Sequence, residues 1–464
     1  MRAIIAALLL ACLALPAEAA GIDGRELGLA WGLPLLGILL SIALVPVLAP
    51  GFWQRHDGTV AAFWGAAFLV PFAYAFGTDA ALGELGHVLL QEYLPFIALL
   101  LALYTTGGGV ILRGTLHGTP LTNTALLAVG TVLASLMGTT GASMLMIRPM
   151  LRANAHRTRR THSFVFFIFL VANIGGSLTP IGDPPLYLGF LNGISFFWPA
   201  QHLFAPFLFC AVILLGLYYA LDSYFYAREP ERPEVATPHA KLNIKGWRNV
   251  VLIGVVIGGV LLQGVWQPGN TTIFGETLKL ERLVAVAMFL LVTLVSLRIT
   301  PHAMRRENDF AWGAMLEVAK LFAAIFLCMG PVLAILRSGP EGAAAGLVAL
   351  TSDPSGAPIT WVYFWMSGLL SSFLDNAPTY LVFFNLAGAD PAHLMTQGAA
   401  TLAAISAGAV FMGANSYIGN APNFMVKAIA EEGGVRMPSF LGYCGWAMLV
   451  LIPLFVLCTF LFFR

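Results

Sequence analysis

The sequence predicts an all-α polytopic membrane protein of two inverted repeats, each with three transmembrane helices, a re-entrant hairpin, a broken transmembrane helix and one further helix. Three observations predict this class. The 464-residue chain is 58% hydrophobic and only 10% charged, whereas a soluble domain carries about 25% charged residues. Apolar stretches long enough to cross a bilayer recur along the chain. Two of them are interrupted by glycine, proline and polar residues at matching places in the two halves.

The first interruption covers residues 171–185, inside an apolar stretch from about Phe164 to Phe197. Its glycines and prolines cannot continue a helix, because they remove backbone donors and favour non-helical angles. Backbone groups freed at membrane depth must be satisfied by protein, ion or water. Asp183 lies inside this break, and an ionisable residue at such a depth indicates a functional site.

The same pattern returns at residues 412–422, where the segment 418–422 corresponds to 181–185. Paired interruptions in corresponding halves are typical of the binding site of a secondary transporter. The alternative is that both breaks are packing kinks. Matching positions favour the binding site.

The repeats and their linker follow from the order of apolar and polar stretches. Residues 1–20 have the layout of a signal peptide, with an uncleaved first helix as the alternative. The first repeat is predicted at 21–225, a polar linker at 226–248 and the second repeat at 249–464. Simple spans are predicted at about 28–51, 59–79, 88–112 and 198–225, and again at about 249–267, 282–298, 314–336 and 440–463.

Each repeat also contains an apolar stretch with a polar centre, at 121–151 and at 361–387. In the first, two arms of about 15 residues would each reach roughly 22 Å, which is too short for two separate crossings. A re-entrant hairpin fits each stretch better. Aligning Ser135 with Ser371 places Thr139 opposite Asp375.

Basic residues set the expected orientation. Five arginines between Arg148 and Arg160 follow the first hairpin, and the positive-inside rule places them in the cytoplasm. Counting spans from there also puts the linker and Arg55 inside and the acidic loop containing Glu84 outside. Corresponding elements then face opposite sides, so the repeats are inverted. We expect a multi-pass protein of the bacterial inner (cytoplasmic) membrane, embedded in the lipid bilayer.

Composition excludes several functions. The net charge of +1 gives no reason to expect a nucleic-acid partner. Five cysteines lie in apolar stretches without metal-ligand spacing and are interpreted as small hydrophobic residues. Phosphate-binding, dinucleotide and zinc motifs are absent from the sequence, so neither ATP-driven transport nor enzymatic redox chemistry is predicted. We expect no enzyme and no cofactor, with sodium and protons as the transported or coupling ions.

The candidate binding residues lie in the hairpins and breaks. Interrupted helices direct their dipole ends and free backbone groups at a shared point. Neutral oxygens and amides are suitable ligands for a hard cation such as sodium. Asp183 and Asp375 add negative charge and are the predicted sites of proton and sodium exchange, including sodium ligation. The neutral candidates are Thr139, Thr140, Ser143, Asn173, Ser177, Thr179, Asn376, Thr379, Asn415, Ser416 and Asn420.

Structural alternatives exist for these residues. Asp183 and Asp375 each precede a helix-compatible segment with proline, so either could simply cap a helix. Ser and Thr in membrane helices commonly bond only to their own backbone. Glu92 and Glu317 each begin the third predicted span of their repeat, and Glu317 has Lys320 one turn on. This pair is interpreted as structural, with a proton relay as the alternative.

The strings Gly176–Asp183 and Leu374–Thr379 resemble the ion transporter superfamily, which includes NhaD-type sodium/proton antiporters, arsenite pumps, citrate carriers and divalent-anion/sodium symporters. The resemblance extends over nearly the whole chain from about residue 28. It is closest to a bacterial branch named either sodium/proton antiporter or citrate transporter. The resemblance implies a homodimer and an elevator-like movement of hairpins and broken helices against a scaffold. The chain lacks the Ser-Asn-Thr hairpin tips of the symporters, and its Leu-Asp-Asn-x-Pro-Thr tip is similar to that of the cation antiporters.

The leading functional interpretation is therefore a sodium/proton antiporter. The alternative is a carrier of citrate or another organic anion that is coupled to a cation. Neither hairpin tip nor broken-helix loop contains Lys or Arg, which mildly disfavours a trivalent anion. Helix N-termini alone can nevertheless hold carboxylates, so the alternative stays open.

Overall fold

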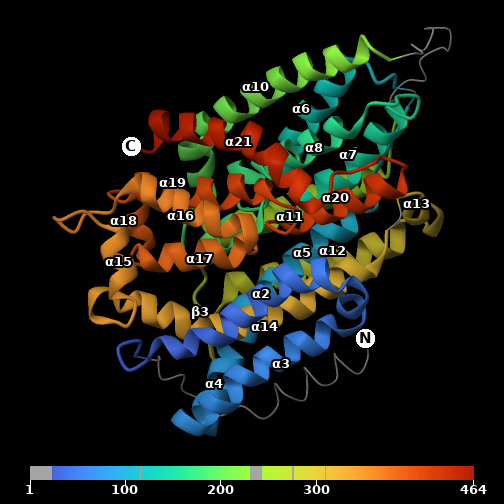
Figure 1. Cartoon of the computed structure of the whole chain (residues 1–464). Helices are drawn as coiled ribbons and strands as arrows, with labels where there is room; N and C mark the ends of the chain where they lie inside the picture. Colours follow the sequence, from blue (N-terminus) through green and yellow to red (C-terminus); the bar gives the residue numbers. More distant parts are fainter. Residues whose placement is uncertain (1–22, 115, 230–242, 274–275, 309) are drawn as a thin grey trace. The chain divides into compact units, whose positions relative to one another are not determined.

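The computed structural model describes residues 23–464, except 115, 230–242, 274–275 and 309. The described chain is almost entirely helical (Figure 1), as predicted. Ten helices in the described residues are long and apolar enough to cross a membrane. The protein is therefore a multi-pass membrane protein of the all-α class. The predicted signal peptide and most of the linker lie outside the described residues.

Two compact units divide the chain, and each is assembled from pieces of both predicted repeats. The first unit contains the described part of residues 1–101 with 258–291 and 311–356. The second unit contains 102–257, 292–310 and 357–464. The early helices of both repeats thus fall in the first unit. Both hairpins and both broken helices fall in the second.

The first unit is a group of long helices with one β-hairpin. Its longest helices, α3 and α14, pack against each other and against α2. Helices α5, α11 (Trp247–Val265) and α12 each cross the boundary of this unit, so only part of each belongs to it. The elements are η1 (Leu29–Gly32), α2 (Leu33–Leu48), α3 (Pro50–Phe76), α4 (Thr78–His87), the π-helix η2 (Val88–Tyr93), α5 (Leu94–Gly107), β3 (Asn270–Ile273), β4 (Glu276–Lys279), α12 (Leu280–Ile299), α14 (Trp312–Arg337), η4 (Gly339–Glu341) and α15 (Ala345–Thr351).

Two loops predicted in the first repeat are helical in the structure. Arg55 lies inside α3, where its side chain is exposed. Lys320 Nζ bonds Asp57 Oδ2 at 2.9 Å, so this buried acid does not have to end the helix. Glu84 lies inside α4 rather than in an acidic loop, because the chain turns earlier, at Gly77 with φ 92°.

Glu92 and Glu317 are not the matched helix starts that the sequence suggested. Glu92 lies in the π-helical segment in the middle of a continuous helical run from α4 to α5. Glu317 is near the start of α14, but the predicted pair with Lys320 is replaced by contacts to α3. Trp53 Nε1 donates to Glu317 Oε1 over 2.6 Å, and Lys320 pairs with Asp57. These contacts join two helices rather than two turns of one.

The second unit contains the interrupted segments. Helix α19 packs against α16, α17 and η3, and α10 packs against α6, α8 and α21; α10 and α21 lie side by side in Figure 1. The elements are β1 (Ile111–Arg113), α6 (Pro120–Met137), α7 (Thr139–Ala153), α8 (Thr161–Leu170), η3 (Ile174–Leu178), α9 (Pro184–Leu191), α10 (Trp198–Tyr226), β2 (Asn243–Lys245), α11 (Trp247–Val265), α13 (His302–Glu307), α16 (Thr360–Phe373), α17 (Asn376–Leu386), α18 (Pro391–Met395), α19 (Ala399–Met412), η5 (Gly413–Asn415), α20 (Ala421–Glu432) and α21 (Phe440–Phe462).

Both predicted hairpins are pairs of helices that pack on each other. The first pair, α6 and α7, breaks at Gly138, which has φ 83°. The second pair, α16 and α17, breaks at Leu374 and Asp375. One arm is longer than predicted, since α6 has 18 residues and is itself long enough for a crossing. Entry of each hairpin from one membrane face, and inversion of the repeats, stay predictions.

The structure also contains four short strands among the described residues, which the sequence analysis did not predict. In the second unit, β1 pairs antiparallel with β2, with Leu112 opposite Ile244. In the first unit, β3 and β4 form a hairpin with Thr271 opposite Leu278. Neither pair closes into a barrel, so the fold class is unchanged.

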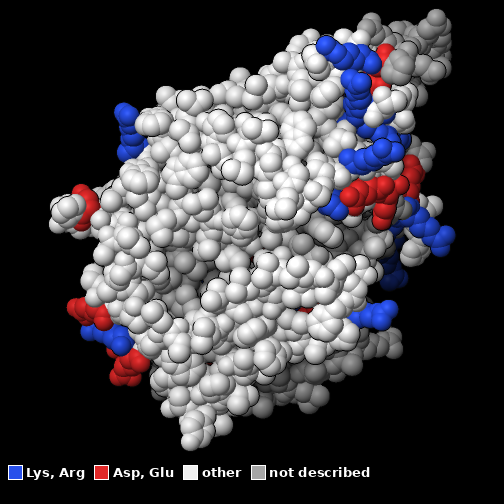
Figure 2. All heavy atoms as spheres, viewed as in Figure 1, with Lys and Arg blue, Asp and Glu red and all other residues white. Residues whose placement is uncertain are grey.

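The surface of the second unit has one strongly basic end. Lys and Arg side chains gather near the end of α10 and over α7 and α20 (upper right in Figure 2). Arg152, Arg159, Arg228 and Arg436 are exposed there. Leu208, Val212, Leu449 and Leu457 are exposed on α10 and α21, which suits contact with lipid. Cys210, Cys328, Cys444 and Cys458 are free thiols, as predicted; Cys12 lies outside the described residues.

Candidate functional site

In both interruptions, the backbones of two glycines lie in close contact. At the first, a Cβ on Gly182 would lie 2.1 Å from the carbonyl oxygen of Gly176. At the second, a Cβ on Gly419 would lie 2.6 Å from the carbonyl oxygen of Gly413. Only glycine permits such an approach of backbone to backbone. The glycines therefore bend each broken helix so tightly that its second half starts close to the end of its first.

The second halves start at equivalent residues. Asp183 is the N-cap of α9 with φ −147° and ψ 144°, and Asn420 is the N-cap of α20 with φ −152° and ψ 138°. In both helices proline occupies the first turn, where its missing N–H has no intrahelical partner to lose. The two breaks thus present one acid and one amide in the same conformation.

The carboxylate of Asp183 is the meeting point of four segments. Thr139 Oγ1 donates to Asp183 Oδ1 over 3.0 Å, and Asn420 Nδ2 donates to the same oxygen over 3.1 Å. Asn376 Nδ2 donates to Asp183 Oδ2 over 2.5 Å. Asp183 is 1% exposed and Asn376 is fully buried. We call these four residues, Thr139, Asp183, Asn376 and Asn420, the Asp183 site.

Matching positions of the two repeats form this site. Thr139 is the first residue of α7, Asn376 is the first residue of α17, and both donate to Asp183. The pairs 139/376 and 183/420 are both separated by 237 positions in the sequence. The predicted alignment of Thr139 with Asp375 is therefore wrong by one residue. Ser371 and Ser372 are adjacent, and the structure matches Ser372 with Ser135.

Further hydrogen bonds occur at equivalent positions in the two repeats and agree with the corrected alignment. Thr179 Oγ1 donates to the carbonyl oxygen of Ser135, and Ser416 Oγ donates to that of Ser372. The N–H groups of Gly182 and Gly419 donate to Thr179 Oγ1 and Ser416 Oγ, each over 3.2 Å. These hydroxyls tie each break to its own hairpin.

The two acids have different roles. Asp183 holds the N-cap position but makes no side-chain cap hydrogen bond, so the capping alternative does not account for it. Asp375 does cap its helix, because its Oδ1 accepts the N–H of Ala377 over 3.0 Å. The side chain of Asp375 is half-buried. The structural alternative therefore applies to Asp375.

Several other predicted ion-binding residues use their side chains in hydrogen bonds to other protein groups. Ser177 Oγ donates to the carbonyl oxygen of Ile174, and Thr379 Oγ1 donates to that of Asp375. Asn173 Nδ2 donates to Asn423 Oδ1 over 2.7 Å, which links the two broken helices. Thr140 is half-buried next to Thr139. Ser177 and Thr379 therefore support their own segments.

Three buried oxygens near the hairpin and break starts lack a hydrogen-bond partner among the described residues: Ser143 Oγ, Asn376 Oδ1 and Asn415 Oδ1. Ser143 lies one helical turn after Thr139 on α7. Asn376 belongs to the Asp183 site itself, and Asn415 Nδ2 donates to Ser372 Oγ. An unsatisfied buried polar atom is costly, and a bound cation or water would satisfy it.

No cation neutralises the carboxylate from within the described protein. None of the ion pairs found between described residues includes Asp183. A cluster of three or more His, Cys, Asp and Glu side chains arranged for a metal ion is likewise not found in this part of the chain. The site thus combines one carboxylate with neutral oxygen and amide groups.

A family model described as "Putative citrate transport" matches residues 24–463 of this chain. The chain belongs to this family. It is also similar to the 46 kDa membrane protein of Mycobacterium leprae, with 23% identity over 325 residues, covering 68% of this chain and 71% of that protein. Membership of the citrate transport family and the multi-pass architecture indicate a membrane transporter of small solutes rather than an enzyme.

Proposed function

We propose that the protein is a secondary transporter of the bacterial inner membrane that exchanges sodium ions for protons, with Asp183 as the residue at which the two compete. One observation carries this proposal: the buried carboxylate of Asp183 is held by Thr139, Asn376 and Asn420, all of which are neutral. A buried carboxylate without a cationic partner must bind a proton or a cation to be stable.

The unpartnered oxygens support sodium as the cation. Hard cations prefer oxygen ligands, and Ser143 Oγ and Asn376 Oδ1 are buried oxygens without a partner among the described residues. A sodium ion would neutralise Asp183 and satisfy such oxygens together. A proton would neutralise the carboxylate alone, so the two states exclude each other.

The composition of the second unit supports an elevator-like movement. All four residues of the Asp183 site, and both glycine-closed breaks, belong to one compact unit. A unit of this kind can move as a rigid body while the hydrogen bonds of the Asp183 site stay intact. We propose that the second unit moves, that the first unit is the scaffold, and that two copies of the chain form a homodimer.

The second candidate is a cation-coupled carrier of citrate or another organic anion. The family description favours it, and so does one structural observation. Helices α7, α9, α17 and α20 all begin at the Asp183 site. Helix N-termini carry partial positive charge and bind carboxylates. In this candidate, Asp183 holds the coupling ion next to the anion.

Transport in proteoliposomes distinguishes the two candidates. With purified protein and an imposed acid-inside gradient, external sodium should dissipate the gradient in the absence of citrate, and labelled citrate should not accumulate. The Asp183→Asn variant keeps the shape of the side chain but not its titration, and we expect it to be inactive. A proton gradient that persists when sodium is added, together with uptake of labelled citrate, would support the second candidate. Normal sodium-driven proton release by Asp183→Asn would contradict the role of Asp183.

A further inference from the structure

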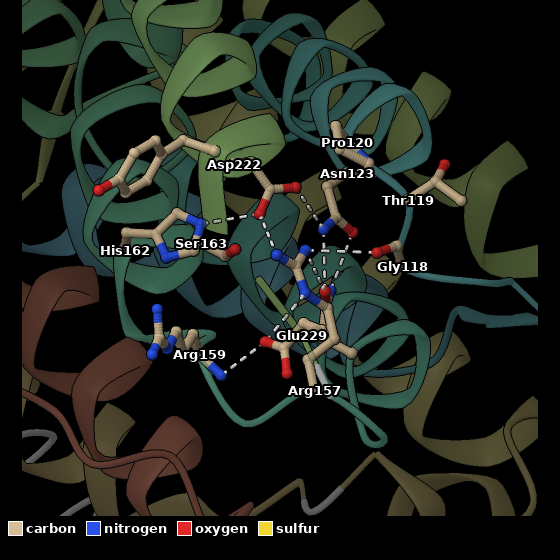
Figure 3. A network of polar contacts seen from close by, with 12 residues as sticks. Gly118, Thr119, Pro120, Asn123, Arg157, Arg159, His162, Ser163, Asp222 and Glu229 are labelled. Carbon is tan, nitrogen blue, oxygen red and sulfur yellow. Dashed lines mark hydrogen bonds and ion pairs between the residues drawn. The ribbon is translucent and has the colours of Figure 1, made fainter. Parts of the chain in front are cut away.

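A second group of buried charged residues lies in the second unit, apart from the Asp183 site (Figure 3). The residues come from the ends of three helices, α6, α8 and α10, and from the segments that follow α7 and α10. We call this group the Arg157 cluster; it consists of Asn123 on α6, Asn154 and Arg157 after α7, His162 on α8, Asp222 on α10 and Glu229 after α10.

The charged side chains of the Arg157 cluster are removed from solvent. The side chains of Arg157 and Asp222 are 0% exposed, that of Glu229 is 2% exposed and that of His162 is 3% exposed. Burying charges is costly unless they are paired and hydrogen-bonded. Their arrangement must therefore balance charge closely.

One carboxylate oxygen lies close to nitrogens of two basic side chains. Arg157 Nη2 lies 2.6 Å from Asp222 Oδ1, and His162 Nε2 lies 2.7 Å from the same oxygen. The other oxygen, Asp222 Oδ2, accepts Asn123 Nδ2 over 3.1 Å. Figure 3 shows His162 and Arg157 approaching Asp222 from different sides. Asp222 thereby connects α6, α8, α10 and the segment after α7.

Glu229 adds a second negative charge. Its Oε2 accepts the N–H and the hydroxyl of Thr158, over 3.1 and 2.7 Å, and its Oε1 accepts the N–H of Arg159 over 2.9 Å. Arg157 Nε lies 3.9 Å from Glu229 Oε1. Burial raises the pKa of Glu229, but these hydrogen bonds and the charge of Arg157 outweigh burial and lower it.

The charge balance of the cluster depends on His162. Arg157 supplies one positive charge against the two negative charges of Asp222 and Glu229. A neutral His162 leaves one negative charge uncompensated, and a protonated His162 brings the sum to zero. We propose that the His162–Asp222 pair is a second proton-binding site, separate from Asp183, whose protonation tightens the joint between α6, α8 and α10.

Other charged and titratable groups around His162 do not replace this role. On α10, Tyr218 stacks on the ring at 5.9 Å and Phe225 at 4.8 Å. Helix α20, which packs on α8, carries Lys427 and Glu431, but these pair with each other at 2.9 Å. His156, in the loop after α7, interacts electrostatically with Arg157, His117 and Glu229, but it is exposed. The other charged residues on the elements around the cluster are Glu432 on α20, Arg148 and Arg152 on α7, and Arg159, Arg160 and Arg436 in the adjoining loops.

The second repeat shows that the fold itself does not require these charges. Between residues 135 and 183 the repeats match with a separation of 237 positions, so Arg157 and His162 correspond to Leu394 and Ala399. Leu394 is 2% exposed. Apolar and neutral groups therefore fill the equivalent place. A purely structural joint would not need the buried ions of the first repeat.

The position of His162 links the Arg157 cluster to the first interruption through a single helix. Helix α8 starts one residue before His162 and leads directly into the first interruption, with Asp183 at its end. Under the predicted orientation, the Arg157 cluster faces the cytoplasm. Proton binding by the His162–Asp222 pair would therefore make the joint respond to cytoplasmic pH. This inference holds whichever solute is transported.

Hydrogen–deuterium exchange of the full-length protein in nanodiscs tests the inference without a transport assay. Protection factors, corrected for intrinsic exchange, are measured for peptides covering 154–163 and 218–229 between pH 5.5 and 8.5. A charged hydrogen bond contributes more than a neutral one, so we expect protection to fall roughly fivefold as pH rises. In His162→Gln, protection should be low and independent of pH.

The control variant is His202→Gln, which removes an exposed histidine from the start of α10, the helix that carries Asp222 near its other end. It should retain the pH response of the wild type. Unchanged protection of the wild-type peptides across the pH range would overturn the inference, even if His162→Gln failed to fold. A full pH response in His162→Gln would overturn it as well.

Discussion

The amide of Asn420 donates a hydrogen bond of 3.1 Å to the carboxylate of Asp183, although the two residues hold the same position in the two broken helices. Both are N-caps in extended conformation, and each precedes a helix with proline in its first turn. Their contact means that the two breaks do not form two sites. They form a single site where the repeats meet.

Thr139 and Ser177 should respond differently to loss of their hydroxyls. Thr139→Val removes a donor to Asp183, whereas Ser177→Ala removes a bond to the backbone of its own 3-10 helix. Losing a bond to a charged group costs about 1–3 kcal/mol, so half-saturating sodium should rise roughly 5- to 150-fold for Thr139→Val. Ser177→Ala should stay near the wild-type value. Sodium titrations of proton release measure both, and equal effects would contradict the assignment.

Asp375 should behave as a helix cap. Asn caps helices about as well as Asp, so Asp375→Asn should keep transport and stability close to the wild type. Asp375→Ala removes the acceptor for the N–H of Ala377 and should lower the free energy of unfolding by about 1 kcal/mol. Complete loss of sodium-dependent proton release in Asp375→Asn would instead make Asp375 a coupling residue.

Gly182→Ala should disrupt the first break. Its Cβ would lie 2.1 Å from the carbonyl oxygen of Gly176 and 2.8 Å from the carbonyl carbon, which is backbone that cannot rotate away. We expect loss of at least about 2 kcal/mol of stability, seen as a lower melting temperature in detergent. Gly216→Ala in α10, where no atom lies within 4 Å of the added Cβ, is the control. A wild-type melting temperature for Gly182→Ala would show that the turn tolerates a side chain.

Glu229 should stabilise the protein in a pH-dependent way. Because its pKa is lowered in the folded protein, its contribution is present above the unfolded pKa of about 4.3 and is lost as pH falls through the folded pKa. Glu229→Gln should therefore unfold more easily at pH 7, by about 1–2 kcal/mol. The difference from the wild type should shrink below about pH 4. Denaturant titrations at both pH values measure this, and a constant difference would exclude the charge as its cause.

The orientation can be tested with single cysteines in a cysteine-free background. Cysteines at positions 155 and 236 should resist an impermeant thiol reagent outside intact cells, and one at position 269 should react. Ala155 and Gly269 are both exposed, so a difference between them reports on the membrane face rather than on burial. Labelling of position 155 from outside would reverse the predicted orientation.

The fold class and the two interruptions could be predicted because both depend on the residue composition of short, continuous segments. Apolar length identifies membrane helices, and the Gly and Pro residues around Asp183 identify a break without reference to distant residues. The one-residue error at Asp375 has a local cause as well. The first hairpin breaks at Gly138 with positive φ, and the second breaks at a capping Asp with φ −56°, so their sequences do not align by residue type.

The long-range contacts could not be predicted in the same way. Arg157 and Asp222 are 65 positions apart, and only the packing of α10 against α6 and α8 brings them together. Asp222 itself was a signal, since it is an acid within an apolar span. The division of hydroxyls between Asp183 and backbone carbonyls depends on turn geometry, which composition does not encode.

The contact between Asp183 and Asn420 also limits how the two halves could diverge from a common ancestor. An acid at both positions would place two like charges about 3 Å apart without water between them, which no protein tolerates unless one is protonated. One of the two equivalent positions must therefore be uncharged for the breaks to meet. Asparagine satisfies this with the fewest changed atoms, because it replaces a carboxylate oxygen by an amide nitrogen that donates to the remaining acid.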